Sequence, residues 1–412
     1  MTDKIKKISG SALKAAKWGA AALITGGVCG LVGTVFHFCV DFAAECFEKY
    51  SFFLYILPFV GLLIALIYRL ARSRGNLSTD RVLEATRSDK SVPPIMAPLI
   101  FAGTVLTHMF GGSAGREGAA LQLGGSISSV IGKAFKLKTP GMHITVMCGM
   151  AALFSALFGT PVAAALFVLE VVDVGVIHYK ALLPCMLSST VAYAIASVLG
   201  VAPMRFELPD DAFILTVKNV LGLAAISVSC GLVAILFCKA LQFGEDLLKE
   251  KLKNDYIRIF ICGTCVVLLT LIIGTRNYNG AGTAIIARAV AGNAMWYDWL
   301  LKLVFTVITI GGGYRGGEIV PSFFVGATFG CAFAHFVGLD PCFGAALGMI
   351  AVFCGVTNTP AASIIMACEL FSGSCFIPIA FAAAVSYMVS GKCSLYHSQK
   401  FLESKFAWTE EG

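Results

Sequence analysis

The sequence predicts an all-α integral membrane protein, and three observations support that fold class. Hydrophobic residues make up 58% of the 412 residues and charged residues 13%, whereas a soluble domain carries about 25% charged residues. The mean hydropathy is +0.83. Apolar runs recur along the chain, and parts of its two halves resemble each other. These observations exclude a disordered chain, a secreted disulfide scaffold and a nucleic-acid-binding protein.

The apolar runs give the expected membrane segments in order, and several are long enough to cross about 30 Å of hydrocarbon. Basic residues precede the first run and follow the second, whereas Asp41, Glu45 and Glu48 lie between these runs. The positive-inside rule therefore places the N-terminus and residues 69–90 in the cytoplasm. A cleaved signal peptide is disfavoured, because no small-residue cleavage site ends a short apolar stretch. The runs cover residues 18–40, 52–68, 141–169, 181–204, 213–238, 259–275, 319–339, 341–368 and 375–390.

Glycines and cysteines are interpreted as structural residues of the membrane segments. The 43 glycines predict many short helices that end inside the membrane, where protein or a water-filled cavity must surround them. The 15 cysteines lie mostly in apolar runs, and the CxxC of Cys262 and Cys265 has no second pair or nearby histidine. Apolar filler is therefore favoured over zinc or redox chemistry. No histidines pair at metal-ligand spacing, and we expect no metal or cofactor.

An internal repeat relates the two halves of the chain. The segment FGTPVAAALFVLE at 158–170 resembles VTNTPAASIIMACEL at 356–370. The prolines and glutamates of the two segments are each 199 residues apart, as Pro161/Pro360 and Glu170/Glu369. Repeated halves with broken helices favour a transporter with its site near mid-membrane, although a duplication retained only for packing is an alternative. For the two glutamates, solvated helix ends or structural pairing are favoured over catalysis.

The polar segment 239–258 is interpreted as a linker between these repeats. We expect one transmembrane transport domain over residues 1–412, with a first repeat at about 15–238 and a second at about 259–400. No cytoplasmic regulatory domain is expected.

The glycine-rich segment GGSAGREG at 111–118, with its counterpart GGGYRGGE at 311–318, is the most informative pattern for chemistry. Exposed backbone amides at a helix start bind anions, and glycine lets an ion approach closely. Glu117 lies where such amides should converge, so its carboxylate could fill the anion site when ionised and leave it when protonated. An internal Arg116–Glu117 ion pair is the alternative, but adjacent helical residues point in different directions.

These motifs resemble those of one family. Gly115-Arg116-Glu117-Gly118-Ala119 is similar to the GREGP motif of the CLC family of anion channels and proton-coupled antiporters. Gly317-Glu318-Ile319-Val320-Pro321 is similar to its GxFxP motif, Gly75-Asn76-Leu77-Ser78-Thr79 lies where the family has GSGIP, and Ser394-Leu395-Tyr396 matches its C-terminal Tyr region. The resemblance covers about residues 15–400. It implies a homodimer of all-helical subunits, each with its own pore built from two inverted halves with many short, broken helices.

The departures from these motifs resemble the fluoride-exporting branch, CLC-F. Asn76 replaces the usual anion-binding Ser, and Glu318 and Ile319 stand where chloride-type members have an apolar residue and Phe. Val171 occupies the position of an internal proton-relay glutamate, and Val320 replaces a hydroxyl residue of some relatives. Fluoride is strongly hydrated and needs strong donors, and the Asn amide has two N–H donors where Ser has one hydroxyl.

The resemblance implies a fluoride/proton antiporter in which Glu117 and Glu318 serve gating and proton coupling. Alternatives remain for three side chains: Asn76 could be a helix cap, Glu318 a cap stabilised by the helix dipole, and Tyr396 an interfacial anchor. The expected anion-binding residues are Asn76, Tyr396, Gly115, Arg116, Gly118, Ile319 and Val320.

The function prediction is a fluoride exporter driven by the proton gradient, multi-pass in a bacterial plasma membrane, and not an enzyme. Its partners are fluoride, protons, the lipid bilayer and a second copy in a homodimer, with no nucleic acid. A chloride/proton exchanger or passive chloride channel of the same fold is the alternative. A membrane enzyme or packing scaffold is the third possibility, but no nucleophile–base pair is evident.

Overall fold

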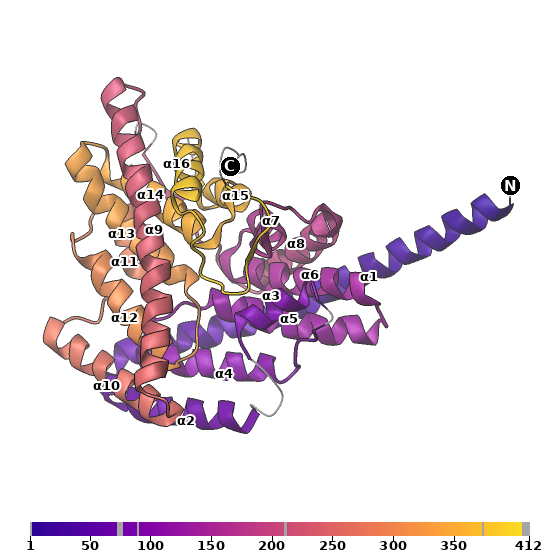
Figure 1. Cartoon of the computed structure of the whole chain (residues 1–412), viewed down its shortest axis with the longest axis horizontal. Helices are drawn as coiled ribbons and strands as arrows, with labels where there is room; N and C mark the ends of the chain where they lie inside the picture. Colours follow the sequence, from indigo (N-terminus) through magenta and orange to yellow (C-terminus); the bar gives the residue numbers. More distant parts are fainter. Residues whose placement is uncertain (1, 72–76, 89, 210–211, 373–374, 406–412) are drawn as a thin grey trace, which may run out of the picture.

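The computed structural model describes residues 2–71, 77–88, 90–209, 212–372 and 375–405. Over these ranges the chain forms 16 α-helices and four two-residue strands (Figure 1). Seven of the helices have the length and apolar composition needed to span a membrane. The predicted all-α membrane fold is confirmed, and the chain is a multi-pass membrane protein.

The first half of the chain contains eight helices and two strands. The first helix is the longest, and the apolar part from Lys17 onward is the predicted first membrane span. The elements are α1 (Thr2–Lys49), α2 (Phe53–Ala71), α3 (Thr79–Ala85), α4 (Met96–Met109), α5 (Glu117–Ala134), α6 (Thr139–Phe158), α7 (Pro161–Val171), β1 (Asp173–Val174), the 3₁₀ turn η2 (Tyr179–Ala181), α8 (Leu182–Val198) and β2 (Phe206–Glu207).

The second half repeats this order of long and short helices. Its elements are α9 (Val217–Lys251), α10 (Asp255–Ile273), α11 (Thr283–Val290), α12 (Asp298–Gly312), α13 (Ile319–Val337), α14 (Pro341–Thr357), α15 (Pro360–Leu370), β3 (Phe371–Ser372), α16 (Phe376–Val389) and β4 (Lys400–Phe401). Figure 1 shows α9 as a long helix running past α13, α14 and α12.

The helix α9 changes the interpretation of the polar segment 239–258. That segment is not an extended linker, because α9 continues through Lys251 and α10 begins at Asp255. Its charges therefore lie on helix ends, where water can solvate them, and only residues 252–254 connect the two helices.

Two predicted apolar runs are each broken into two helices at matching positions. The run 141–169 breaks after α6, where Gly159 has a left-handed φ of 72° and Pro161 begins α7. The run 341–368 breaks after α14, where Asn358 has φ 59° and Pro360 begins α15. A left-handed residue ends a helix and proline starts one without losing a hydrogen bond, so local sequence explains both breaks.

The helix pairs α5·α6 and α13·α14 form the centre of the molecule. A side chain at Gly124 would lie 2.1 Å from the Gly149 carbonyl oxygen, and one at Gly326 would lie 2.3 Å from that of Gly348. The helix backbones therefore touch at these glycines, as small residues allow in membranes. Helices α2 and α10 instead expose apolar side chains to the surroundings, as expected for lipid-facing spans.

The short strands join one half to the other. β1, which follows α7, pairs in parallel with β4 near the C-terminus. β3, which follows α15, pairs in parallel with β2 of the first half. The segment after α7 is thus hydrogen-bonded to the second half of the chain, and the segment after α15 to the first half.

Candidate anion and proton-coupling site

The two glycine-rich segments meet directly, although they are separated by about 200 residues. Gly115 and Gly317 form an isolated antiparallel bridge, in which each N–H donates to the other's carbonyl oxygen at 2.7 Å. The Gly115 amide, which we expected to contact the anion, is therefore engaged with Gly317. Its role is to join the halves at the site.

Two helices begin beside this bridge. α5 begins at Glu117, and its first internal hydrogen bond is from the Ala120 N–H to the Arg116 carbonyl. α13 begins at Ile319, and its corresponding bond is from Ser322 to Glu318. The N–H groups ahead of these bonds have no partner within their helices, and both helix dipoles place positive potential here. The arrangement is suited to binding an anion.

The Glu117 side chain folds back over its own helix start. It is 1% exposed, and its Oε2 accepts a hydrogen bond from the Arg116 backbone N–H at 2.9 Å. A side chain at Gly115 would lie 2.8 Å from this oxygen, so only glycine leaves room for the carboxylate. Glu117 thus already occupies part of an amide-lined position, which is the geometry expected of a carboxylate that competes with an anion.

Arg116 contacts Glu117, contrary to our expectation that adjacent residues would diverge. Its Nε lies 3.5 Å from Glu117 Oε1. The two side chains can meet because Arg116 is the N-cap residue and the Glu117 carboxylate bends back toward it. The main partners of the guanidinium are on α1, where Nη1 donates to Asp41 Oδ1 at 2.9 Å and lies 2.7 Å from His37 Nδ1.

Glu318 holds the matching position before α13. It is the N-cap residue but makes no side-chain capping hydrogen bond, so the alternative of a capping side chain does not apply. Its Oε2 lies 3.3 Å from where a side chain at Gly118 would begin. The two glutamates therefore flank the junction of the halves, with the first amides of α13, those of Ile319 and Val320, beside it; Pro321 has no N–H to contribute.

A cavity of about 410 Å³ leads to Glu318 from the side that the positive-inside rule assigns to the cytoplasm. Basic residues at the ends of α2, α9 and α10 line it, together with acidic residues. The charged lining residues are Arg69, Asp80, Glu245, Lys249, Asp255, Arg258, Arg315 and Glu318.

Two hydroxyl groups that line this cavity are buried without a hydrogen-bond partner among the described residues. They are Tyr396 Oη and Ser78 Oγ. Tyr396 is 4% exposed, so it is not an interfacial anchor. Ser78 stands at the N-cap position of α3, but its hydroxyl makes no capping hydrogen bond. Buried hydroxyls normally find partners, so these two are available to a ligand.

The backbone around Tyr396 is held by a side chain that sequence reasoning missed. Gln399 is buried, and its Nε2 donates to the carbonyls of Val171 and Thr357, both at 2.9 Å. Its Oε1 accepts from Ser394 Oγ at 2.6 Å and Asn358 Nδ2 at 2.9 Å. All four hydrogen-bonding positions of the amide are filled, and the bonds join the ends of α7 and α14 to the Tyr396 segment.

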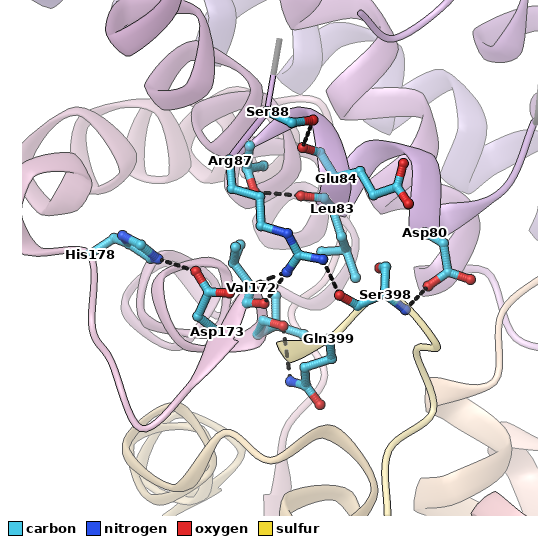
Figure 2. A network of polar contacts seen from close by, with 12 residues as sticks. Asp80, Leu83, Glu84, Arg87, Ser88, Val172, Asp173, His178, Ser398 and Gln399 are labelled. Atoms are coloured by element: carbon cyan, nitrogen blue, oxygen red, sulfur yellow. Dashed lines mark hydrogen bonds and ion pairs between the residues drawn. The ribbon is translucent and has the colours of Figure 1, made fainter. Parts of the chain in front are cut away.

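A second set of contacts, from α3 and the turn that follows it, fixes the same segment (Figure 2). Arg87 donates to the carbonyl of Val172, to Asp173 Oδ1 and to the carbonyl of Ser398. Asp80 Oδ1 accepts from the Ser398 N–H at 2.8 Å. These bonds connect α3, which begins directly after Ser78, to the segment that carries Tyr396. No local pattern marked Arg87 or Gln399, because their partners are far away in sequence.

The structure answers the predictions for Asn76 and Val171 differently. Asn76 lies outside the described residues. Val171 is fully buried in the core, with its carbonyl bonded to Gln399. Ser78 was not predicted as a site residue, although a hydroxyl two residues after Asn76 was an available signal.

Glu170 and Glu369 are structural partners across the repeat, one of the two interpretations favoured from the sequence. The Glu170 carboxylate accepts from the N–H groups of Ala361 and Ala362 at the start of α15, at 3.1 and 2.9 Å. The Glu369 carboxylate accepts from those of Val162 and Ala163 at the start of α7, at 3.1 and 2.8 Å. Each carboxylate therefore caps the short helix of the other half.

Two halves with broken helices, paired glycine-rich segments and helix-start amides gathered where the halves meet define a membrane ion-transport protein. The family model described as "Voltage gated chloride channel" matches residues 59–391. The chain therefore belongs to this family, the CLC family, as its motifs led us to expect.

Individual relatives agree with the family assignment. A "Chloride/fluoride channel protein" of Pseudomonas syringae pv. tomato is 32% identical over 397 residues, which cover 95% of this chain and 88% of the relative. A solved structure of a CLC-type fluoride/proton antiporter is also 32% identical, with a TM-score of 0.90, covering 94% of this chain and 99% of that one. A slow cyanobacterial Cl⁻/H⁺ antiporter, at 17% identity and a TM-score of 0.78, shares the fold.

Proposed function

We propose that this protein is a fluoride/proton antiporter, which exports fluoride by using the inward proton gradient. The observation that carries the proposal is the position of Glu117, a buried carboxylate folded onto a helix start beside the junction of the two halves. The two relatives at 32% identity, one described as a chloride/fluoride channel protein and one as a fluoride/proton antiporter, support the choice of substrates.

Glu117 couples the two ions by occupying the anion position only when it is ionised. The ionised carboxylate accepts the amide hydrogen bond that a fluoride ion would otherwise accept. Protonation removes its negative charge and weakens its hold on the amides, so fluoride can enter while the proton remains on the side chain. Each exchange therefore moves fluoride and a proton in opposite directions.

Fluoride reaches this position through the cavity that ends at Glu318. The basic residues that line the cavity attract anions. Tyr396 Oη and Ser78 Oγ can donate to fluoride without first breaking a hydrogen bond within the protein. Asn76 adds amide donors from the segment that precedes Ser78, and the amides of Gly118, Ile319 and Val320 complete the site. The Arg116 contribution is its backbone N–H, because its guanidinium is directed toward α1.

Protons leave by the same cavity instead of an internal glutamate on α7. Val171 cannot carry a proton, whereas Glu318 lies at the inner end of the cavity and Asp80 and Glu245 line it toward the cytoplasmic side. Glu318 accepts the proton from Glu117 across the junction of the halves or hydrogen-bonds to hydrogen fluoride. The protein functions as a homodimer in which each subunit has its own pathway.

Paired ion fluxes test this proposal. Liposomes containing the purified protein are loaded with fluoride or chloride, and anion efflux and proton uptake are recorded together. Fluoride efflux with thermodynamically coupled proton uptake is expected, and Glu117→Gln should abolish the coupling. Robust chloride flux with little fluoride flux would reject the selectivity, and anion flux that no proton gradient can drive would identify a passive channel. Normal proton uptake by Glu117→Gln would reject the role of that carboxylate.

A further inference from the structure

Arg116, His37 and Asp41 connect Glu117 to the surface on the side of the molecule opposite the cytoplasmic cavity, and their exposure increases along this series. Glu117 is 1% exposed, Arg116 and His37 are 13% and 12% exposed, and Asp41 is 48% exposed at the side chain. His37 and Asp41 lie one turn apart on α1, beyond its midpoint, on the side opposite the basic N-terminus. They therefore face the proton source of the proposed antiport, on which this inference rests.

The geometry assigns the hydrogen atoms of this cluster. An arginine guanidinium can only donate, so His37 Nδ1, 2.7 Å from Arg116 Nη1, must be the acceptor. The ring proton then lies on Nε2, which is 3.1 Å from Asp41 Oδ2. The second hydrogen of Arg116 Nη1 is donated to Asp41 Oδ1 at 2.9 Å. The contact with Arg116 therefore favours the neutral form of His37.

Protonation of His37 is incompatible with this arrangement. A hydrogen on Nδ1 would point at a guanidinium N–H, and two cations would compete for the Asp41 carboxylate. The Arg116–His37 contact must then break. The nearest other anion for Arg116 is Glu117, whose Oε1 lies 3.5 Å from Nε, longer than a charge-assisted hydrogen bond.

We propose that His37 and Asp41 are positioning residues that hold Arg116 away from Glu117, and that external acid releases Arg116 onto the Glu117 carboxylate. The tighter ion pair keeps Glu117 ionised in the anion position and slows exchange. The cluster thereby limits proton entry when the outside is strongly acidic. It acts through Arg116 alone and touches neither ion.

Other charged and titratable groups near the cluster are accounted for. Helix α4 contributes His108, whose Nδ1 pairs with the Thr104 carbonyl oxygen at 2.8 Å. His143 of α6 contacts the Ser88 carbonyl near the cytoplasmic side. The remaining titratable or charged groups on α1 beyond its midpoint, on the helices packed against it and on the loop that contacts it are Cys29, Cys39, Glu45, Cys46, Glu48 and Lys49 of α1, Lys133 of α5, Cys148 of α6, Cys185 and Tyr193 of α8, and Arg276, whose Nη1 donates to the Phe47 carbonyl.

The test is fluoride efflux from proteoliposomes with equal pH on both sides, from pH 5 to 8. His37→Asn keeps an acceptor near the Nδ1 position but cannot be protonated. We expect it to match the wild type at pH 7.5 and to exceed it by about three- to tenfold at pH 5.5, across the range in which histidine titrates. His335→Asn, on the exposed end of α13, is the matched control and should keep the wild-type profile.

Asp41→Asn is a second variant, at a side chain that is 48% exposed. A neutral amide holds Arg116 more weakly than the carboxylate does, so this variant should exchange fluoride more slowly than the wild type already at pH 7.5. The inference is overturned if His37→Asn reproduces the wild-type pH profile, or if it is folded but equally slow at every pH. Failure of the wild type itself to exchange fluoride for protons would instead refute the proposed function.

Discussion

The unpartnered hydroxyl of Tyr396 leads to opposite predictions for stability and for ion binding. Tyr396→Phe removes only Oη, which is buried and has no partner among the described residues. An unsatisfied buried polar group costs about 1–3 kcal/mol, so its removal should leave the free energy of unfolding unchanged or raise it. A hydrogen bond to a charged group contributes about 1.5–3 kcal/mol, so fluoride affinity should fall roughly 10- to 100-fold.

Tyr278→Phe is the matched control, because its hydroxyl is also buried but has a protein partner. Tyr278 Oη donates to Asp298 Oδ1 at 2.7 Å, away from the cavity. Its loss should destabilise the protein by about 1.5–3 kcal/mol without changing fluoride affinity. The assay combines thermal unfolding in detergent with the fluoride concentration dependence of efflux. A destabilised Tyr396→Phe protein with wild-type fluoride affinity would refute this reasoning, because its hydroxyl would then be a structural donor.

Three further variants probe the contacts that build the site. Glu170→Gln should lower thermal stability by about 1.5–3 kcal/mol, since an amide accepts fewer hydrogen bonds from a helix start than a carboxylate does; an unchanged melting temperature would contradict the capping role. Gly124→Ala should cost about 1–3 kcal/mol or more by pushing against the Gly149 carbonyl, whereas Gly27→Ala, with open space around it, should be neutral in the same melting assay. Gln399→Leu should weaken fluoride binding in the efflux assay as well as stability, because four buried groups each lose one hydrogen bond; wild-type fluoride affinity would show that Tyr396 is positioned without it.

Local sequence signals predicted the parts of the fold that depend on neighbouring residues. The prolines of the repeat, Pro161 and Pro360, fall at two helix starts inside the expected runs 141–169 and 341–368, and proline at the first helical position was a local signal for both breaks. Helices α4 and α12 were missed as separate apolar runs. They carry buried polar side chains, including His108, Lys302 and Thr306, which interrupt the apolar pattern although the helices are packed inside the protein.

Contacts between the halves could not be predicted from spacing alone. The glycine-rich motifs marked Glu117 and Glu318, but the Gly115–Gly317 bridge depends on how two distant helices approach each other. Gln399 likewise has no recognisable motif, since its meaning comes from carbonyls at the ends of α7 and α14. The sequence therefore identified the residues with unusual chemistry, and the three-dimensional arrangement identified those that hold them.

The exchange of carboxylate caps between the two halves has an evolutionary consequence. A half-length ancestor would have carried one short helix whose first N–H groups lacked acceptors. Its one glutamate would have followed the same helix, too far from those N–H groups to accept from them. Two copies inserted in opposite orientations would have satisfied each other, as Glu170 and Glu369 now do within one chain. Gene fusion would then have made permanent an antiparallel partnership that the chemistry of a single repeat already required.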